Sequence, residues 1–351
     1  MSGWELFLEA AVKVVAAFVL LMLNTLFLVW FERKVVADMQ NRVGPNRAGP
    51  FGVLQTLADG MKLFFKESMT PAKVEFIPYI LAPVAALLPS LLIFLVIPIG
   101  EPFMIGDREI TLQVTDLNVG LLYFLALSSV AVYAVVLAGW SSGSKYPLLG
   151  SVRASAQMIS YEAAMGLALV PVVLLAGTTS LAGIVDVQSG TFGSFLPSWN
   201  IVLLPSFVIF FIAGVAETNR APFDLVEAEQ EIVGGYHTEY SGIRFALFFL
   251  AEYINMFNIS ALTVVIFLGG WHGPVFGPDW FSWILPIFWF LLKTYLLLFV
   301  FVWLRATLPR MRYDQLMSFG WKRLIPISLL WIVLATVALG VRRFGLPWEG
   351  L

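Results

Sequence analysis

Long apolar runs separated by polar segments dominate the pattern of this chain. A helix needs about 20 apolar residues to cross a bilayer core about 30 Å thick. Eight stretches qualify, and they cover residues 10–31, 76–99, 117–139, 156–180, 199–216, 243–269, 280–304 and 324–341. The strands of a membrane β-barrel would alternate in polarity, which these runs do not. The pattern predicts an all-α polytopic membrane protein with one integral membrane domain over residues 1–351.

The positions of Lys and Arg predict how this domain is oriented. Sixteen of the 21 basic residues fall in the segments on one side of the eight spans, and three fall on the other side. Cytoplasmic loops carry the excess of Lys and Arg in membrane proteins. We therefore expect loops 32–75, 140–155, 217–242 and 305–323 inside, and both termini outside.

Composition narrows the possible chemistry. Hydrophobic residues make up 59% of the chain and charged residues 13%, against about 45–50% and about 25% in soluble domains. This composition excludes a soluble enzyme and a nucleic-acid binder. The chain has no cysteine, and its two histidines, His237 and His272, fall on opposite sides of the predicted membrane. We expect no iron–sulfur cluster and no haem, so electron transfer would need a diffusible substrate or a partner's centres.

The first inner loop, residues 32–75, contains a predicted amphipathic helix. Gly and Pro are dense over residues 44–52 and predict tight turns. A helix is expected from Val53 to Glu67, with one apolar face formed by Leu54, Leu57, Ala58, Met61, Phe64 and Phe65. This face either packs against the spans or lies in the membrane surface, where it would flank the mouth of a site for an apolar ligand.

The second inner loop, residues 217–242, is acidic on the side where basic residues are expected. It carries Glu217, Asp224, Glu227, Glu229, Glu231 and Glu239 against only Arg220 and His237. Crowded carboxylates titrate as a set with at least one raised pKa. A buried proton-exchanging cluster is the favoured interpretation, and a solvated acidic loop is the alternative.

Three ionisable residues fall at membrane depth, where such residues suggest function. They are Glu162, Glu252 and Lys293. They either pair with one another or, in the case of the two glutamates, continue a chain of protonatable sites from the acidic loop. Arg305 and Arg310, at the inner end of the seventh span, are interpreted as simple membrane anchors.

Three segments together resemble one family. They are Glu32–Lys62, with Gln40-Asn41-Arg42-Val43-Gly44-Pro45-Asn46-Arg47; Ala216–Glu229, with Glu217-Thr218-Asn219-Arg220-Ala221-Pro222-Phe223-Asp224; and Gly242–Tyr253. The chain resembles the H subunit of bacterial respiratory complex I, which is homologous to subunit 1 of mitochondrial NADH dehydrogenase. The likeness covers essentially the whole chain. One mild departure is Gly235, where the family pattern has Ser or another small residue.

This resemblance implies a membrane subunit of a proton-translocating NADH:quinone oxidoreductase, with quinone as its substrate. The quinone chamber would be lined by Arg33, Arg42, Asp59, Lys62, Phe223 and Asp224. The isoprenoid tail would reach it near the first and sixth spans and the amphipathic helix. A proton relay would consist of Glu217, Glu227, Glu229, Glu231, Glu252 and Glu162.

The resemblance also implies partners and a location. Peripheral-arm subunits would complete the quinone site and carry FMN and the iron–sulfur clusters. Small membrane subunits would lead to antiporter-like pumps. The isolated chain is expected to be inactive, and the complex to lie in a bacterial plasma membrane.

Two alternatives stay open from the sequence. One is the equivalent subunit of a hydrogenase-type ion-pumping complex, which needs no quinone tail channel. The other is a stand-alone cation/proton antiporter, although the inverted repeats typical of transporters are not visible.

Overall fold

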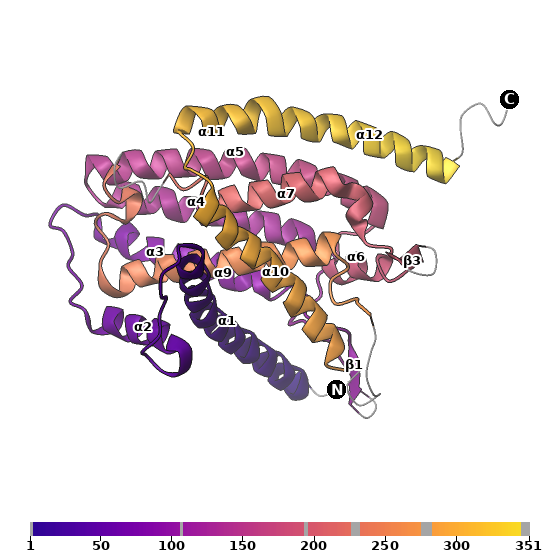
Figure 1. Cartoon of the computed structure of the whole chain (residues 1–351), viewed down its shortest axis with the longest axis horizontal. Coiled ribbons are helices and arrows are strands. Elements are labelled where there is room, and N and C mark those ends of the chain that lie inside the picture. Colours follow the sequence, from indigo (N-terminus) through magenta and orange to yellow (C-terminus); the bar gives the residue numbers. More distant parts are fainter. Residues whose placement is uncertain (1–2, 106–107, 193–195, 226–231, 275–282, 345–351) are drawn as a thin grey trace.

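The computed structural model of the chain is almost entirely helical (Figure 1), and it describes residues 3–105, 108–192, 196–225, 232–274 and 283–344. The first long helix is α1 (Gly3–Met39), followed by the short α2 (Gln55–Phe65). The remaining α-helices are α3 (Phe76–Phe94), α4 (Gly120–Ser141), α5 (Lys145–Ala176), α6 (Leu181–Val187), α7 (Leu204–Glu217), α9 (Gly242–Phe267), α10 (Leu285–Thr307), α11 (Tyr313–Phe319) and α12 (Ile325–Phe344).

Short elements complete the described residues. Turns of 3₁₀-helix cover η1 (Pro50–Gly52), η3 (Asn200–Leu203) and η4 (Gly235–His237), and a π-helical turn (Gly320–Leu324) joins α11 to α12. Two small antiparallel hairpins pair β1 (Phe103–Ile105) with β2 (Arg108–Ile110), and β3 (Thr191–Phe192) with β4 (Leu196–Pro197).

Seven segments of the described chain are helical, long and apolar enough to cross a membrane, which confirms the predicted fold class. They correspond to every predicted span except the fifth. In that region, predicted over 199–216, the structure has η3 and then α7, which is only 14 residues long. A total of eight spans therefore stays a prediction.

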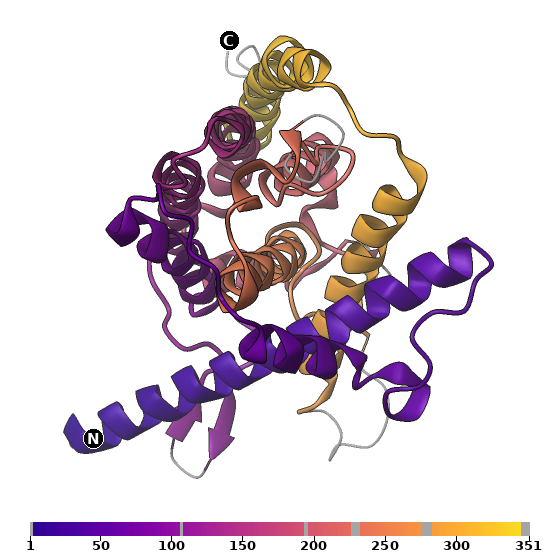
Figure 2. The same ribbon diagram turned by 90° about the vertical axis from the view of Figure 1, so that its left-hand side faces the viewer.

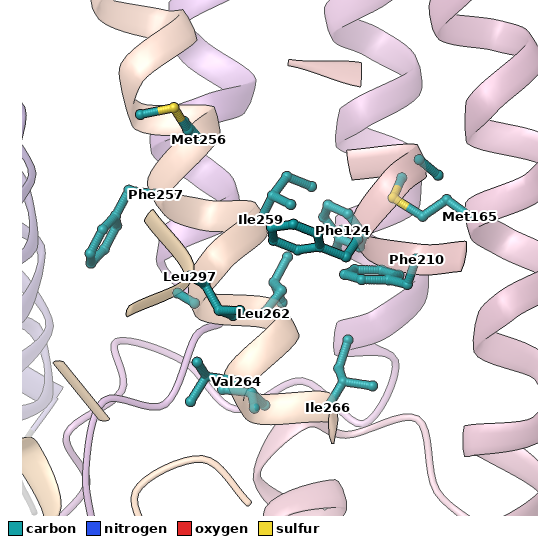
Figure 3. Packing of buried hydrophobic residues seen from close by; sticks show 14 of the residues in the cluster. Phe124, Met165, Phe210, Met256, Phe257, Ile259, Leu262, Val264, Ile266 and Leu297 are labelled. Carbon is teal, nitrogen blue, oxygen red and sulfur yellow. The ribbon is translucent and has the colours of Figure 1, made fainter. Parts of the chain in front are cut away.

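Helix α9 lies at the centre of the bundle (Figure 2). Helices α3, α7, α10 and α1 all pack against it, and its second half is buried without interruption from Met256 to Phe267. Figure 3 shows the apolar packing, with Ile259 and Leu262 of α9 close to Phe124 of α4 and Phe210 of α7. The first half of α9 is less completely covered, but the Glu252 side chain on it is only 16% exposed and therefore needs a partner inside the protein.

The polar segments sort to the two ends of the bundle. In Figure 1, α2 and α11 lie at one end, and α6, β1 and β3 lie at the other, where α1 starts and α12 ends. This is the grouping expected if loops 32–75 and 305–323 share one side and both termini share the opposite side. Which end faces the cytoplasm stays a prediction, and we refer to the end with α2 as the inner end.

The apolar face of α2 is not packed against the spans of this chain. Leu54, Leu57, Met61 and Phe64 are exposed, and Phe65 is 86% exposed. The opposite face, which includes the buried Thr56, turns toward α1 and α9. Of the two interpretations of this helix, the structure favours the one in which its apolar face lies in the membrane surface.

Candidate functional site: a buried network of ionisable side chains

The inner half of α1 carries a buried carboxylate, Glu32, which is only 5% exposed. Its two oxygens accept a hydrogen bond of 2.6 Å from the Tyr253 hydroxyl and one of 3.4 Å from Nη1 of Arg220. Nη1 of Arg305 also donates to Glu32. Arg305 is therefore a partner of a buried carboxylate, and its interpretation as a simple membrane anchor is wrong.

Arg220, in the segment after α7, is shared between two carboxylates. Its Nε lies 2.7 Å from Oε1 of Glu252, and its guanidinium lies 4.4 Å above the Tyr253 ring. Burial would lower the pKa of Arg220, but the negative charges of Glu252 and Glu32 more than offset this and raise it above its ordinary value. Arg220 therefore stays charged and connects Glu32 on α1 with Glu252 on α9.

A polar cleft of about 450 Å³ opens next to Glu32. Its walls include Arg33, Arg42, Tyr253 and Arg305, which come from α1, the turn after α1, α9 and α10. The structure thus brings together two of the predicted quinone-site residues, Arg33 and Arg42, and adds Glu32, Tyr253 and Arg305 to them.

Asp59 joins this cleft through Arg33. Its Oδ2 lies 2.5 Å from Nη1 of Arg33, and Gln55 donates to its other oxygen at 3.1 Å. Burial alone would raise the pKa of Asp59, but these hydrogen bonds and the charge of Arg33 hold it below its ordinary value. Lys62 lies on the same helix, α2, but it is exposed and does not line the cleft.

Phe223 and Asp224 lie elsewhere. Phe223 packs against the ring of Tyr161 with 5.2 Å between ring centres, and Asp224 accepts an ion pair from Arg310 at 3.2 Å. Both residues are buried and neither lines the cleft. Because Arg310 neutralises a buried carboxylate, it too is more than the membrane anchor expected from the sequence.

Glu162 and Glu217, two members of the predicted relay, lie close together between α4, α5 and α7. Both Ser128 and Ser129 of α4 donate hydrogen bonds to Oε1 of Glu162, the first at 3.3 Å. Glu217 is near enough to Ser128 and Glu162 to interact with both. Its Oε2 atom is buried and makes no hydrogen bond with the residues that the structure describes. The two carboxylates, Glu162 on α5 and Glu217 at the end of α7, are therefore neighbours beside the hydroxyl groups of α4.

A small polar cavity of about 50 Å³ separates these carboxylates from the arginine network. Glu217 contributes to its wall from α7, Glu252 from α9 and His237 from η4. Five of the described ionisable residues therefore lie in a row. The row begins at the polar cleft with Glu32, continues through Arg220 and Glu252, and reaches Glu217 and Glu162 on the far side of this cavity.

Glu227, Glu229 and Glu231, the other predicted relay residues, lie outside the described residues. The expected crowding of carboxylates in the second inner loop is therefore untested at these three positions and stays a prediction.

Lys293 does not pair with Glu162 or Glu252, which was one interpretation of the ionisable residues at membrane depth. Its ammonium group donates instead to the backbone oxygens of Leu268, Gly270 and His272, at 2.7, 3.1 and 2.5 Å. It also lies 4.3 Å from the centre of the Trp199 ring. These contacts place Lys293 at the outer end of α9, far from the arginine network.

An apolar groove of about 890 Å³ runs between α1, α9 and α10. Val12, Val19 and Phe27 of α1 form one wall, and Leu291 of α10 and Phe257 of α9 contribute to the other. Polar atoms enter it only through Asn24 and Tyr295, whose side chains are hydrogen-bonded to each other at 2.6 Å. The groove suits a hydrocarbon chain.

Four residues of the network were not singled out as site residues in the sequence. Glu32 and Tyr253 stand inside recognised segments, but the sequence does not show what they contact. Arg220 belongs to a recognised segment of an acidic loop, and Arg305 has the position of a membrane anchor. One signal in the sequence points to them. A carboxylate at the end of an apolar helix, such as Glu32, requires a cation, and Arg220 and Arg305 both follow the inner ends of predicted spans.

Comparisons with known proteins agree over nearly the whole chain. A family model described as NADH dehydrogenase matches residues 12–336. A protein of Frankia alni, named as the H subunit of NADH-quinone oxidoreductase, is 56% identical over 329 residues, covering 92% of this chain and 71% of the relative. A protein of the same name from Frankia casuarinae is 56% identical over 324 residues, covering 92% of this chain and 70% of the relative.

Proposed function

Because the chain belongs to the NADH dehydrogenase family and is a membrane subunit of an NADH-quinone oxidoreductase, we propose that its buried ionisable residues couple quinone reduction to proton translocation. The predicted resemblance to the H subunit of complex I is confirmed by the same matches, and they do not favour the hydrogenase-type complex or the stand-alone antiporter.

The position of Arg220 between Glu32 and Glu252 is the observation that carries this proposal. Glu32 lines the polar cleft, whereas Glu252 lines the small polar cavity. Reduction of a quinone to a quinol takes up two protons, and any charge that develops in a poorly hydrated cleft acts strongly on Glu32. A change in the charge of Glu32 alters how tightly it holds Arg220, and therefore how easily Glu252 accepts a proton.

The cleft and the groove supply two different environments for one substrate. The cleft, with Arg33, Arg42 and the neighbouring Asp59, offers polar groups to a quinone head. The groove beside α1 and the uncovered apolar face of α2 offer hydrocarbon surface to its tail. Lys62, Phe223 and Asp224 remain proposed members of the quinone chamber. They would lie at its edge or contact the partner subunits that complete it.

The remaining features of the complex are part of the same proposal. Glu227, Glu229 and Glu231 would exchange protons between the cleft and the cavity. Peripheral-arm subunits would carry FMN and the iron–sulfur clusters, and small membrane subunits would continue from Glu162 toward antiporter-like pumps. The inner end of the bundle would face the bacterial cytoplasm, with both termini outside.

Glutamate-to-glutamine variants of the assembled complex test the relay. We expect Glu217→Gln, Glu227→Gln and Glu231→Gln each to lower quinone-linked proton pumping to about a tenth or less. Electron flow from NADH to a soluble artificial acceptor should be unchanged, because that route bypasses the membrane subunit. Glu101→Gln, at the exposed outer end, is the matched control. Normal pumping in all three relay variants would contradict the proposal.

Photo-crosslinking with an azido-quinone in the assembled complex tests the substrate site separately. Labelling of residues 33–66 or 217–252 is expected. Labelling confined to other subunits would argue against a chamber wall in this chain.

A further inference from the structure

Two residues that line the same small cavity each carry a buried polar atom that has no hydrogen-bond partner among the described residues. These atoms are Nε2 of His237 and Oε2 of Glu217. Buried polar groups almost always have a partner, which is either protein or ordered water. The cavity volume of about 50 Å³ is enough for about three to five water molecules, because one needs about 10–15 Å³ on this measure. The polar lining supplies the hydrogen-bonding groups that such waters need.

The surroundings of His237 fix the direction of its ring. Tyr236, Phe245 and Phe248 lie around it, with distances of 3.9, 5.5 and 5.3 Å between ring centres. Nε2 of this imidazole makes no hydrogen bond with any residue that the structure describes. Burial lowers the pKa of His237 to about 3, so the ring is neutral at physiological pH. A neutral imidazole has one donor and one acceptor, and either can bind water.

The backbone of η4 holds this histidine in place. Gly235 has φ 55°, which favours glycine, and it lies directly against Gly150 of α5. A Cβ atom on Gly150 would come within 2.7 Å of the Gly235 Cα atom. The close approach gives a physical reason for glycine at position 150, and the positive φ gives one for glycine at position 235. The close approach also means that His237 sits on a turn that cannot easily move away from the cavity.

We propose that the cavity is a hydration site in which water joins His237 Nε2 to Glu217 and Glu252, and that His237 positions this water for proton transfer between the two glutamates. A proton that leaves one carboxyl group passes along the waters to the other carboxylate, and the total charge around the cavity is unchanged. His237 acts as a positioning residue. This inference rests on the proposed function, since it supplies the step across the gap between Glu252 and Glu217.

Two substitutions at His237 in the assembled complex separate this role from simple packing. His237→Phe keeps an aromatic ring among Tyr236, Phe245 and Phe248 but removes the nitrogen. We expect proton pumping to fall about tenfold, with normal electron flow to a soluble acceptor. His237→Gln returns polar atoms to the cavity and should recover pumping to within about twofold of the wild type. His272→Phe, at the other end of α9, is the matched control and should pump normally.

Infrared difference spectra of the complex provide a readout that does not depend on pumping. Quinone reduction should change O–H stretching bands that shift in H₂¹⁸O, and these bands should be absent in His237→Phe and present in His272→Phe. Persistence of the bands in His237→Phe, or normal pumping by that variant, would overturn the inference. If Glu217→Gln abolishes pumping while His237→Phe does not, the proposed relay stands and only the role of His237 fails. Normal pumping in the glutamate variants would remove the proposed function itself.

Discussion

Two buried cations at opposite ends of α9 are held in different ways. Near its inner end, Arg220 is held by the carboxylates of Glu32 and Glu252. At the outer end, Lys293 is held by three backbone oxygens. A carboxylate can take up a proton and release its cation, whereas a backbone oxygen keeps the same charge at every pH. The inner site can therefore change state, while the outer site is suited to fixing the fold.

The largest effect in this comparison is expected for Arg220→Leu. It would leave Glu32 with the Tyr253 hydroxyl and Arg305 and would remove the cation that contacts Glu252. Loss of one partner from a buried ion pair costs about 3–5 kcal/mol, so the amount of assembled complex and its thermal midpoint should both fall. Arg312→Leu, at an arginine whose side chain is 72% exposed, is the control. A complex that assembles and melts like the wild type would show that the two carboxylates do not need Arg220.

Lys293→Met should have a smaller effect, of a different kind. Three backbone oxygens lose a charged donor, and we expect a loss of about 3 kcal/mol in the free energy of unfolding. The number of protons pumped per electron should not change in the complexes that do assemble. A changed number of protons pumped per electron, together with normal stability, would place Lys293 in the proton pathway. The outer end of α9 would then take part in proton transfer as well as in fixing the fold.

The smallest expected effect concerns pH and His237. Its pKa in the folded chain, about 3, lies below the ordinary value of 6.5, so the unfolded chain binds the proton more readily. The stabilising contribution of neutral His237 is complete above pH 6.5 and is lost as the pH falls toward 3, by about 1.4 kcal/mol per pH unit.

Thermal midpoints of the wild-type and His237→Phe complexes between pH 7.5 and about 5 check this expectation. The wild type should lose stability faster than the variant as the pH falls. Glu217 and Glu252, the acidic residues that line the cavity, and Arg220, which contacts Glu252, are present in both proteins, so their titration largely cancels. Parallel curves would show that His237 is not buried as a neutral group.

The sequence predicted the helical membrane fold well because long apolar runs have few other stable structures in a bilayer. It was less informative where a short element is completed by its neighbours. Residues 199–216 were expected to form one span, but the helix begins only at Leu204, after the turn that contains Asn200. The side chain of Asn200 donates to the backbone of Ile266, and its own backbone N–H donates to Gln188. Such long-range contacts are not encoded in local periodicity.

The candidate site shows the same division. The cost of ionisable residues in an apolar environment singles out Glu162, Glu252 and Lys293, and the acidic inner loop adds Glu217. Glu162, Glu217 and Glu252 lie in one region, whereas Lys293 lies at the outer end of α9. Their partners could not be assigned, because Glu32 and Arg220 are separated by 188 residues along the chain. Arg305 and Arg310 resembled the basic residues that usually end a membrane helix, and only the packing of α1 and α10 reveals that Arg305 reaches Glu32.

The uncovered face of α2 affects how this protein should be handled. Asp59 on α2 forms an ion pair with Arg33, which lines the polar cleft, and the opposite side of α2 is apolar and uncovered. Where neither a quinone tail nor a partner subunit covers that side, the surrounding lipid or detergent does. A detergent micelle, a nanodisc and a native bilayer will each cover this face of α2 differently. Differences in enzyme kinetics among these preparations will therefore also reflect how α2 is covered beside the cleft.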